Sequence, residues 1–353
     1  MTPQAELLCI GNAIVDVFSA TDFSRMEKFG IRESVQHIDR DLAEVILREL
    51  GAGGAFLTSG GGAANVAKIS AMLGMKAAFC GCVGQDPLAE VFRQDLASAG
   101  AGTFLSHGKG KTGVCLVLSS GEERRIAASP GAALELSWPN IDEALFSEAR
   151  VIVIDGYILD NRSLVQQILT RAGQLKIPAA IDAASVFQIR DKAEEILEYS
   201  RSYPLFLFMN TDEAIAFYNT VLKSGKKETE LNESEKIEII YTDVCPMIKK
   251  ITEGKTFPVA VIKLGSRGAV VVAGGSVYRE ESSPVSSGDT VGVGDAFAAA
   301  FLSSWIRGHP LSECAALGNR VARLILEVPG TAIEESRLKT FAADLKRYKI
   351  NNA

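Results

Sequence analysis

Short apolar segments alternate with longer amphipathic segments through most of the chain. The short segments are largely unbroken apolar runs, typical of buried strands, and comprise residues 6–11, 77–84, 151–156, 179–184, 205–210, 258–265 and 268–274. The longer segments have helical patterns and comprise residues 65–73, 87–99, 162–174, 193–200, 211–222, 296–305 and 311–326. Buried strands separated by helices predict a mostly parallel sheet covered on both faces, with ligands bound at the carboxyl ends of its strands.

Two regions interrupt this alternation. Residues 102–128 read as short strands around a Ser-Gly turn, and residues 12–20 have the same character. We expect these two segments to form a small sheet that projects from the main body. The other region, residues 223–238, is polar and charged and is interpreted as a surface insertion or a solvated helix. Residues 1–353 are expected to form a single domain.

The composition is that of an ordinary globular protein. Hydrophobic residues make up 47% of the chain, and the net charge is -6 with no long basic run. Nucleic acid and membranes are therefore not expected partners. The N-terminal segment lacks the basic start of a signal peptide, and no apolar run approaches the ~18 residues of a membrane helix. The six cysteines are scattered and the three histidines lie far apart, which indicates free thiols in a reducing cytoplasm and no structural zinc site.

Residues 286–302 combine a glycine-rich stretch with the start of an apolar helix. Glycines just before a helix allow its unpaired N–H groups to approach an anion such as phosphate. Gly292, Val293 and Gly294 would supply these groups, and Asp295 lies directly beside them. A carboxylate beside bound phosphate suggests a base that accepts a proton from an attacking hydroxyl. The alternative, that Asp295 only caps the helix, fits the local pattern equally well.

Other phosphate-binding motifs fit the sequence less well. The segment GVGDAF lacks the third glycine of a dinucleotide-binding fingerprint and lies far from the first strand. The GKT at residues 110–112 is preceded by Leu105 where a P-loop needs glycine, and a strand pattern follows it. No G-x-S-x-G elbow is present.

Five spaced motifs together resemble the ribokinase-like (PfkB) family of carbohydrate and nucleoside kinases. DTVGVGDAF resembles its D-T-x-G-A-G-D signature, with Val293 in place of the usual alanine. The other motifs, in the family's order, are GGGAANVAKISAMLG, GCVGQDPLAEVFRQDLASAGA, NTDE and KLGSRGAVV. The resemblance implies an α/β fold of the ribokinase-like three-layer α/β/α type, with a mostly parallel central sheet and the small sheet as a lid. It also implies an ATP-dependent kinase that uses Mg²⁺; dependence on K⁺ stays open.

The resemblance also implies roles for residues on the phosphate side of the site. Asp295 matches the catalytic base, and the three residues before it match the anion hole. Thr290 would touch the nucleotide phosphates, and Asp289 would brace the same loop or contribute to a monovalent-cation site. The remaining nucleotide-side candidates are Asn210, Glu213, Lys263, Gly265, Gly268 and Asn319. Glu213 would act on the metal through water; its alternative is a helix capping box with Asn210, and the alternative for Asn319 is a plain helix surface.

The acceptor side carries a second set of candidates. GNAIVD resembles the G-N-x-x-x-D of adenosine kinases, so Asp16 would accept hydrogen bonds from two sugar hydroxyls and position a third for attack. The other acceptor candidates are Asn12, Gly61, Gly62, Asn65 and Tyr157. Tyr157 would stack on a base, although packing explains a single tyrosine as well. Arg124 would reach the site from the small sheet, or belong to a charged turn.

The long interval between Asp16 and Gly61 favours a nucleoside kinase over a shorter sugar kinase. We therefore expect phosphorylation of the 5′-hydroxyl of a purine nucleoside, most simply adenosine to AMP. A sugar kinase of the same family, acting on ribose or fructose, is the alternative. A catalytically silent nucleotide-binding regulator is a third reading, disfavoured because the base and the anion hole are both present. The sequence leaves open whether the protein is a monomer or a homodimer.

Overall fold

The computed structural model describes residues 5–51, 54–121, 123–224, 231–282 and 291–326, together with residue 338. The candidates Asp289 and Thr290 lie outside the described residues. No helix within these ranges is long and apolar enough to cross a membrane.

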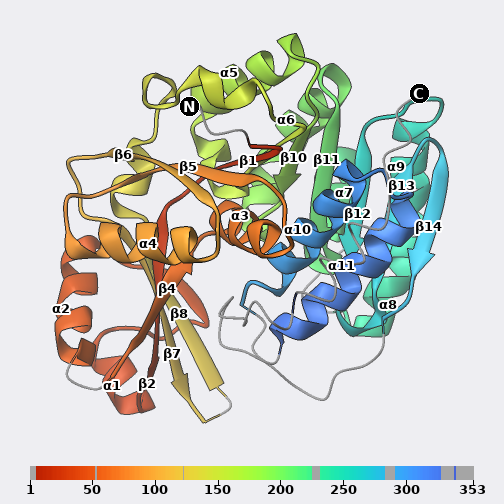
Figure 1. Cartoon of the computed structure of the whole chain (residues 1–353). Helices are drawn as coiled ribbons and strands as arrows, with labels where there is room; N and C mark the ends of the chain where they lie inside the picture. The colour runs from red at the N-terminus through yellow and green to blue at the C-terminus, as the bar shows by residue number, and fades with distance from the viewer. Residues whose placement is uncertain are drawn as a thin grey trace.

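A nine-stranded sheet forms the centre of the molecule (Figure 1). Its strand order is β14-β13-β12-β11-β10-β9-β1-β5-β6, and every neighbouring pair from β12 to β6 is parallel. Only β13 and β14 are antiparallel additions at one edge. The strands are β1 (Leu7–Ile10), β5 (Ala77–Val83), β6 (Gly102–His107), β9 (Val151–Ile154), β10 (Ala179–Asp182), β11 (Leu205–Asn210), β12 (Val259–Lys263), β13 (Ala269–Ala273) and β14 (Ser276–Glu280).

Helices cover both faces of this sheet and form two separate apolar cores (Figure 1). Alternate residues of β1 show the division: Leu7 and Cys9 face one core, whereas Leu8 and Ile10 face the other. The first core includes helices α3 (Gly62–Met72), α4 (Pro87–Ser98), α10 (Val293–Ile306) and α11 (Leu311–Ile325). The second includes α5 (Arg162–Gln174), α6 (Val186–Ser202), α7 (Thr211–Leu222), α8 (Glu233–Ile239) and α9 (Cys245–Thr252). The predicted three-layer α/β/α architecture is therefore confirmed.

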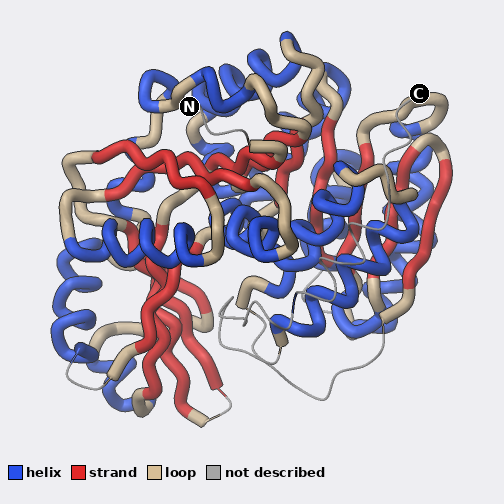
Figure 2. Tube along the Cα trace, viewed as in Figure 1, coloured by secondary structure: helices blue, strands red, loops and turns tan. Residues whose placement is uncertain are grey.

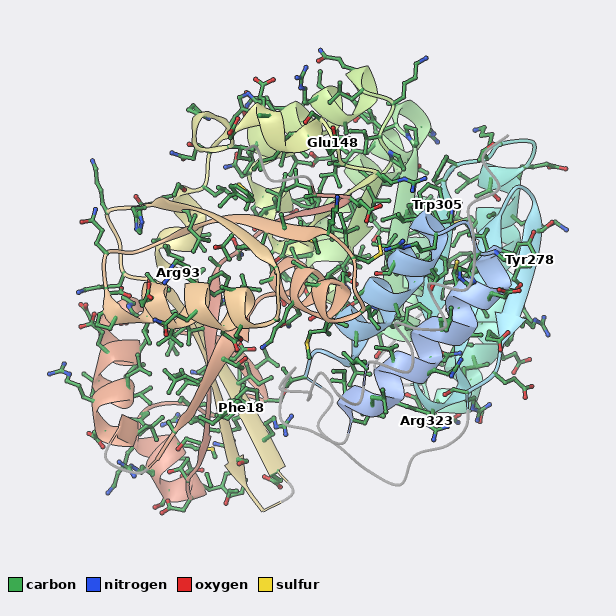
Figure 3. All side chains as sticks on the ribbon, in the orientation of Figure 1. Phe18, Arg93, Glu148, Tyr278, Trp305 and Arg323 are labelled. Carbon is green, nitrogen blue, oxygen red and sulfur yellow. The ribbon has the colours of Figure 1, made fainter. Side chains whose placement is uncertain are left out.

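A second, five-stranded sheet projects from one end of the molecule (Figure 2). Its order is β3-β8-β7-β2-β4, with β2 (Ile14–Ala20), β3 (Val35–His37), β4 (Phe56–Gly60), β7 (Gly113–Ser120) and β8 (Glu123–Ser129). Its inner residues pack with α1 (Phe23–Lys28) and α2 (Arg40–Gly51), where Met26 and Ile46 are buried. Figure 3 shows Phe18 on this sheet, well apart from Trp305 at the end of α10. The expected small sheet is therefore present.

The structure corrects the expected bounds of the small sheet. Residues 102–107 form β6, which pairs in parallel with β5 at the edge of the large sheet. Their side chains are mostly half-buried, because β6 is an edge strand with a neighbour on one side only. A half-buried strand resembles the strands expected in a lid, so the segment was assigned to the small sheet. Two strands of the small sheet, β3 and β4, were not predicted, since β4 consists of FLTSG and lacks a long apolar run.

The polar segment at residues 223–238 proves to be partly helical. Its described end forms the start of α8, whose residue Ile237 is buried, so this part is more than a solvated surface segment. Asn232 begins the helix by accepting the N–H of Glu235, and Glu235 accepts the N–H of Asn232 in return. Residues 225–230 of the segment lie outside the described residues.

Candidate active site

Helix α10 begins with backbone groups that no side chain of the described residues caps. Gly292 precedes the helix with a φ of 76°, a left-handed conformation that glycine adopts without strain, and among the described residues no side chain forms a cap hydrogen bond there. The first N–H groups are therefore available to an external anion. Asp295 lies in the first turn and does not occupy the cap position. The interpretation of Asp295 as the helix cap is therefore wrong.

Asp295 accepts a hydrogen bond from a residue that is 230 positions away in the sequence. Asn65, in the first turns of α3, donates its Nδ2–H to Asp295 Oδ2 at 2.8 Å. Burial, followed by the negative charge of Asp182, raises the pKa of Asp295 to about 7. The hydrogen bond from Asn65 acts in the opposite direction, because it favours the charged carboxylate. A carboxyl group with this pKa is suited to accept a proton near neutral pH.

A partly buried ion pair lies beside the start of α10. Lys263, the last residue of β12, places its Nζ 2.8 Å from Oδ2 of Asp182, the last residue of β10. Burial alone would lower the pKa of Lys263, but the charges of Asp182 and Glu213 outweigh it and raise that pKa. A Cβ added to Gly294 would come within 3.0 Å of Lys263 Nζ. The lysine charge therefore lies directly against the candidate anion hole.

Asn210 and Glu213 form the capping box that the sequence left as an alternative. Asn210 Oδ1 accepts the Glu213 N–H at 2.9 Å, and Glu213 Oε2 accepts the Asn210 N–H at 2.7 Å. This arrangement fixes the start of α7 after the adjacent strand β11. Burial and the nearby Asp182 raise the pKa of Glu213 well above its usual value. A capping role and a role near the bound phosphates are compatible, because the box uses only part of the carboxylate.

The acceptor candidates meet where the small sheet joins the main body. Asp16 is buried in β2, opposite Thr58 of β4 and Cys115 of β7. A Cβ on Gly60 would collide with the Asp16 carboxylate, and one on Gly61 would collide with the carbonyl of buried Asn12. Gly61 also has a φ of 93°. Glycine is therefore required where β4 turns into α3, next to the candidate acceptor residues.

A cavity of about 170 Å³ joins the acceptor side to Asp295. Its polar lining consists of Asp155, Tyr157, Asp182 and Asp295, and Gly62 forms part of its wall. The Gly62 position faces Asp295, because a Cβ there would lie 3.4 Å from Oδ1. Tyr157 is 42% exposed and lines this cavity.

Asp155 and Asp182 are the site residues that the sequence analysis missed. Both lie within the predicted strands at 151–156 and 179–184, each directly after an unbroken apolar run. That position is a usable signal, since the carboxyl ends of parallel strands meet at one edge of the sheet.

The remaining nucleotide-side candidates belong to the turn between β12 and β13 and to helix α11. Gly268 has a φ of 97°, and a Cβ there would collide with the carbonyl of Glu280. Asn319 is buried and donates its Nδ2–H to the same carbonyl at 3.2 Å, so it is not a plain surface residue. Gly265 has a φ of 60° and faces open space. Arg124 lies on β8 opposite Ser119, within the small sheet.

Comparison with known proteins assigns the chain to a family. Residues 34–337 match the model of the pfkB family carbohydrate kinases, so the chain belongs to this family. It is therefore a phosphotransferase with an alcohol group as acceptor. The chain is 24% identical over 346 residues to an adenosine kinase of Schizosaccharomyces pombe, covering 93% of this chain and 96% of that one.

Two solved structures have the same fold over almost the whole chain. The adenosine kinase from Sinorhizobium meliloti has a TM-score of 0.79 and 26% identity, covering 96% of this chain and 99% of that one. A probable sugar kinase from Rhizobium etli has the same TM-score of 0.79 and 25% identity, covering 98% of this chain and 100% of that one. The expected ribokinase-like fold is confirmed, and the relatives include both nucleoside and sugar kinases by name.

Proposed function

We propose that this enzyme transfers the terminal phosphoryl group of ATP to the 5′-hydroxyl of a purine nucleoside, converting adenosine to AMP. The observation that carries the proposal is the position of Asp295. Its carboxylate lies in the first turn of α10, accepts a hydrogen bond from Asn65, and opens into the same cavity as Gly62 and Tyr157. The candidate base, the start of α10 and the pocket on the acceptor side therefore lie next to one another.

In the proposed reaction Asp295 accepts the proton of the attacking hydroxyl. The N–H groups at Gly292, Val293 and Gly294 bind the transferring phosphoryl group, and the adjacent Lys263 adds positive charge. Asp16 holds the acceptor by its hydroxyl groups, so that the reacting oxygen lies in line with the phosphorus. Because the pKa of Asp295 is about 7, the base is partly ionised at neutral pH, and its conjugate acid releases the proton readily afterwards.

Magnesium would enter this site together with ATP. Among the described residues no group of three Asp, Glu, His or Cys side chains lies close enough to hold a metal ion. Mg²⁺ would therefore be held mainly by phosphate oxygens and water, as this ion commonly is, with Glu213 acting through water. When bound, the ion would neutralise charge on the phosphates.

The half-exposed Tyr157 at the cavity favours a nucleoside, since its ring offers a stacking face for a purine base. The similarity to the probable sugar kinase of Rhizobium etli keeps a sugar acceptor as the second candidate. ADP release measured with a panel of nucleosides and sugars separates the two. We expect adenosine to give the highest kcat/KM. Turnover of a hexose but not of adenosine would show that the acceptor is a sugar and not a nucleoside. ATP binding without turnover of any acceptor would indicate a regulator.

A further inference from the structure

One carboxyl group in the cavity has no assigned task. Asp155 follows β9 and is only 3% exposed. Its Oδ1 accepts the N–H of Tyr157 at 3.0 Å and so caps the short 3₁₀ helix at Gly156–Asp160. Its Oδ2 is buried and has no hydrogen-bond partner among the described residues. The N–H groups of Asn12 and Ala63 favour its charged form, but neither makes a hydrogen bond of ordinary geometry to Oδ2.

Few groups around Asp155 stabilise the negative charge of its carboxylate. Burial raises its pKa to about 6, and the negative charge of Asp182 contributes in the same direction, so the group is still mostly charged at pH 7. Lys263 does not line the cavity and is paired with the neighbouring Asp182. The carbon atoms around it are packed closely, since a Cβ on Gly11 would collide with Asp155 Cβ.

Capping does not explain why this residue carries a charge. Asparagine caps helices about as well as aspartate, and the cap uses only Oδ1. A charged oxygen that is buried without a partner destabilises the folded protein. Costs of this kind are retained where function requires them. The cavity wall that Asp155 shares with Asp295 and Tyr157 is the place where an acceptor would lie under the proposed function.

We propose that Asp155 is a specificity-determining residue of the acceptor pocket, whose Oδ2 accepts a hydrogen bond from a hydroxyl or amino group of the acceptor. The inference rests on the proposed function, because it needs an acceptor bound beside Asp295. It extends that function by requiring a hydrogen-bond donor on the acceptor in addition to the hydroxyls held by Asp16. A buried acceptor group of this kind discriminates strongly against analogues that lack the matching donor.

Asp155→Asn tests the inference while preserving the cap. The amide oxygen still accepts the Tyr157 N–H, but the charge is lost and a donor replaces Oδ2. We expect kcat/KM for adenosine to fall by roughly 30-fold or more, mainly through the KM for adenosine. The KM for ATP stays within about 3-fold, and the melting temperature without ligand is unchanged or higher, because the buried charge is removed.

Asp142→Asn is the matched control. Asp142 caps another short 3₁₀ helix in the same way, by accepting the N–H of Ala144 at 2.9 Å, but it is exposed and does not line the cavity. Its kinetics should remain those of the wild type. An Asp155→Asn enzyme with an unchanged KM for the acceptor would overturn the inference, whatever its stability.

Acceptor analogues identify the partner of Oδ2. The probes are 2′-deoxyadenosine, 3′-deoxyadenosine and purine riboside, which each lack one hydrogen-bond donor. In the wild type, kcat/KM for one of these analogues should be much lower than for adenosine. In Asp155→Asn the difference between that analogue and adenosine should be less than about 3-fold, because the analogue and the substitution remove the same hydrogen bond. Additive losses for all three analogues would contradict the inference. If the panel identifies a sugar, its monodeoxy derivatives serve as the probes.

These outcomes separate the two proposals. Normal turnover of adenosine by the wild type, with no change in Asp155→Asn, overturns only the role of Asp155. Turnover of a sugar in place of adenosine overturns the proposal of a nucleoside acceptor. The role of Asp155 is then tested with that sugar and its monodeoxy derivatives. An enzyme that turns over neither class of acceptor overturns both.

Discussion

Asn65 and Asp295 are 230 positions apart in the sequence, yet the amide of the first donates to the carboxylate of the second at 2.8 Å. The contact joins the first turns of α3 and α10, two helices that pack against each other on one face of the sheet. Because α3 starts at Gly62, directly after β4, the same contact fixes the base relative to the acceptor side of the site. The position of Asp295 thus depends on both halves of the chain.

Replacing Asn65 by alanine should shift the pH dependence of catalysis to higher pH. The hydrogen bond from Asn65 favours the charged form of Asp295 and lowers its pKa, so removing it raises that pKa by about one unit. At pH 7 kcat should fall roughly 10-fold, with part of the loss recovered at pH 9. Ser70→Ala is the control, because it removes another contact between α3 and α10, to Ser303, and neither serine lines the cavity. An acidic limb of the kcat profile that does not move would rule out this role for Asn65.

The stability of the unliganded protein should fall as the pH rises from about 5 to 8. Burial raises the pKa values of Asp155 to about 6 and of Asp295 to about 7, whereas both are near 4 in the unfolded chain. The stabilisation by these groups is fully present below their unfolded pKa and is lost as the pH rises through the folded pKa. We expect a decrease of roughly 3 kcal/mol in the free energy of unfolding, measured with urea. The double variant Asp155→Asn and Asp295→Asn should show a smaller decrease; an equal decrease would mean that other groups are responsible.

Glu213→Gln should separate the capping role of this residue from its proposed role near the metal. Glutamine also serves in a capping box, so the free energy of unfolding should not fall. Because the negative charge is lost, the Mg²⁺ concentration for half-maximal activity should rise by about 5-fold or more. Glu235→Gln provides the control, since Glu235 forms the same box with Asn232 at the start of α8. Unchanged Mg²⁺ dependence in Glu213→Gln would leave the residue with a capping role alone.

Lys263→Met should be strongly destabilising. The change leaves the partly buried Asp182 beside Asp295 and Glu213 without its cation, which costs about 3 kcal/mol in the free energy of unfolding. Arg93→Met, which breaks a pair with Glu90 on the surface of α4, should cost less than about 1 kcal/mol. Adding Asp182→Leu to Lys263→Met should restore much of the stability but not the activity. If activity returns as well, the lysine has only a structural role.

The sequence predicted the elements with the clearest local signals. The helices at residues 162–174 and 211–222 were predicted from their helical pattern with the bounds that α5 and α7 have, and in the structure Asn161 and Asn210 cap their starts. Strand β6 was assigned to the wrong sheet, since the pairing partner of a half-buried strand is a tertiary property. Helix α2 was not predicted.

The site was predictable in part. The glycine-rich start of α10 carries its chemistry in adjacent residues, so Asp295 could be singled out from the sequence. Asp155 follows β9 and Asp182 ends β10, and only the sheet order brings them to one cavity. The pKa of Asp155 is raised by burial, which a strand pattern does not reveal. The same is true of the ion pair between Asp182 and Lys263, which spans 81 positions.

The kcat of Asp295→Asn tests the central claim most directly. Asparagine preserves the size of the side chain and an oxygen for the Asn65 amide, but it cannot accept the proton of the acceptor hydroxyl. With the acceptor that the panel identifies, kcat should fall at least ~10²-fold, while the dissociation constant for ATP stays within about 3-fold and the protein remains folded. A kcat within about 3-fold of the wild type would contradict the assignment of Asp295 as the base and the mechanism that depends on it.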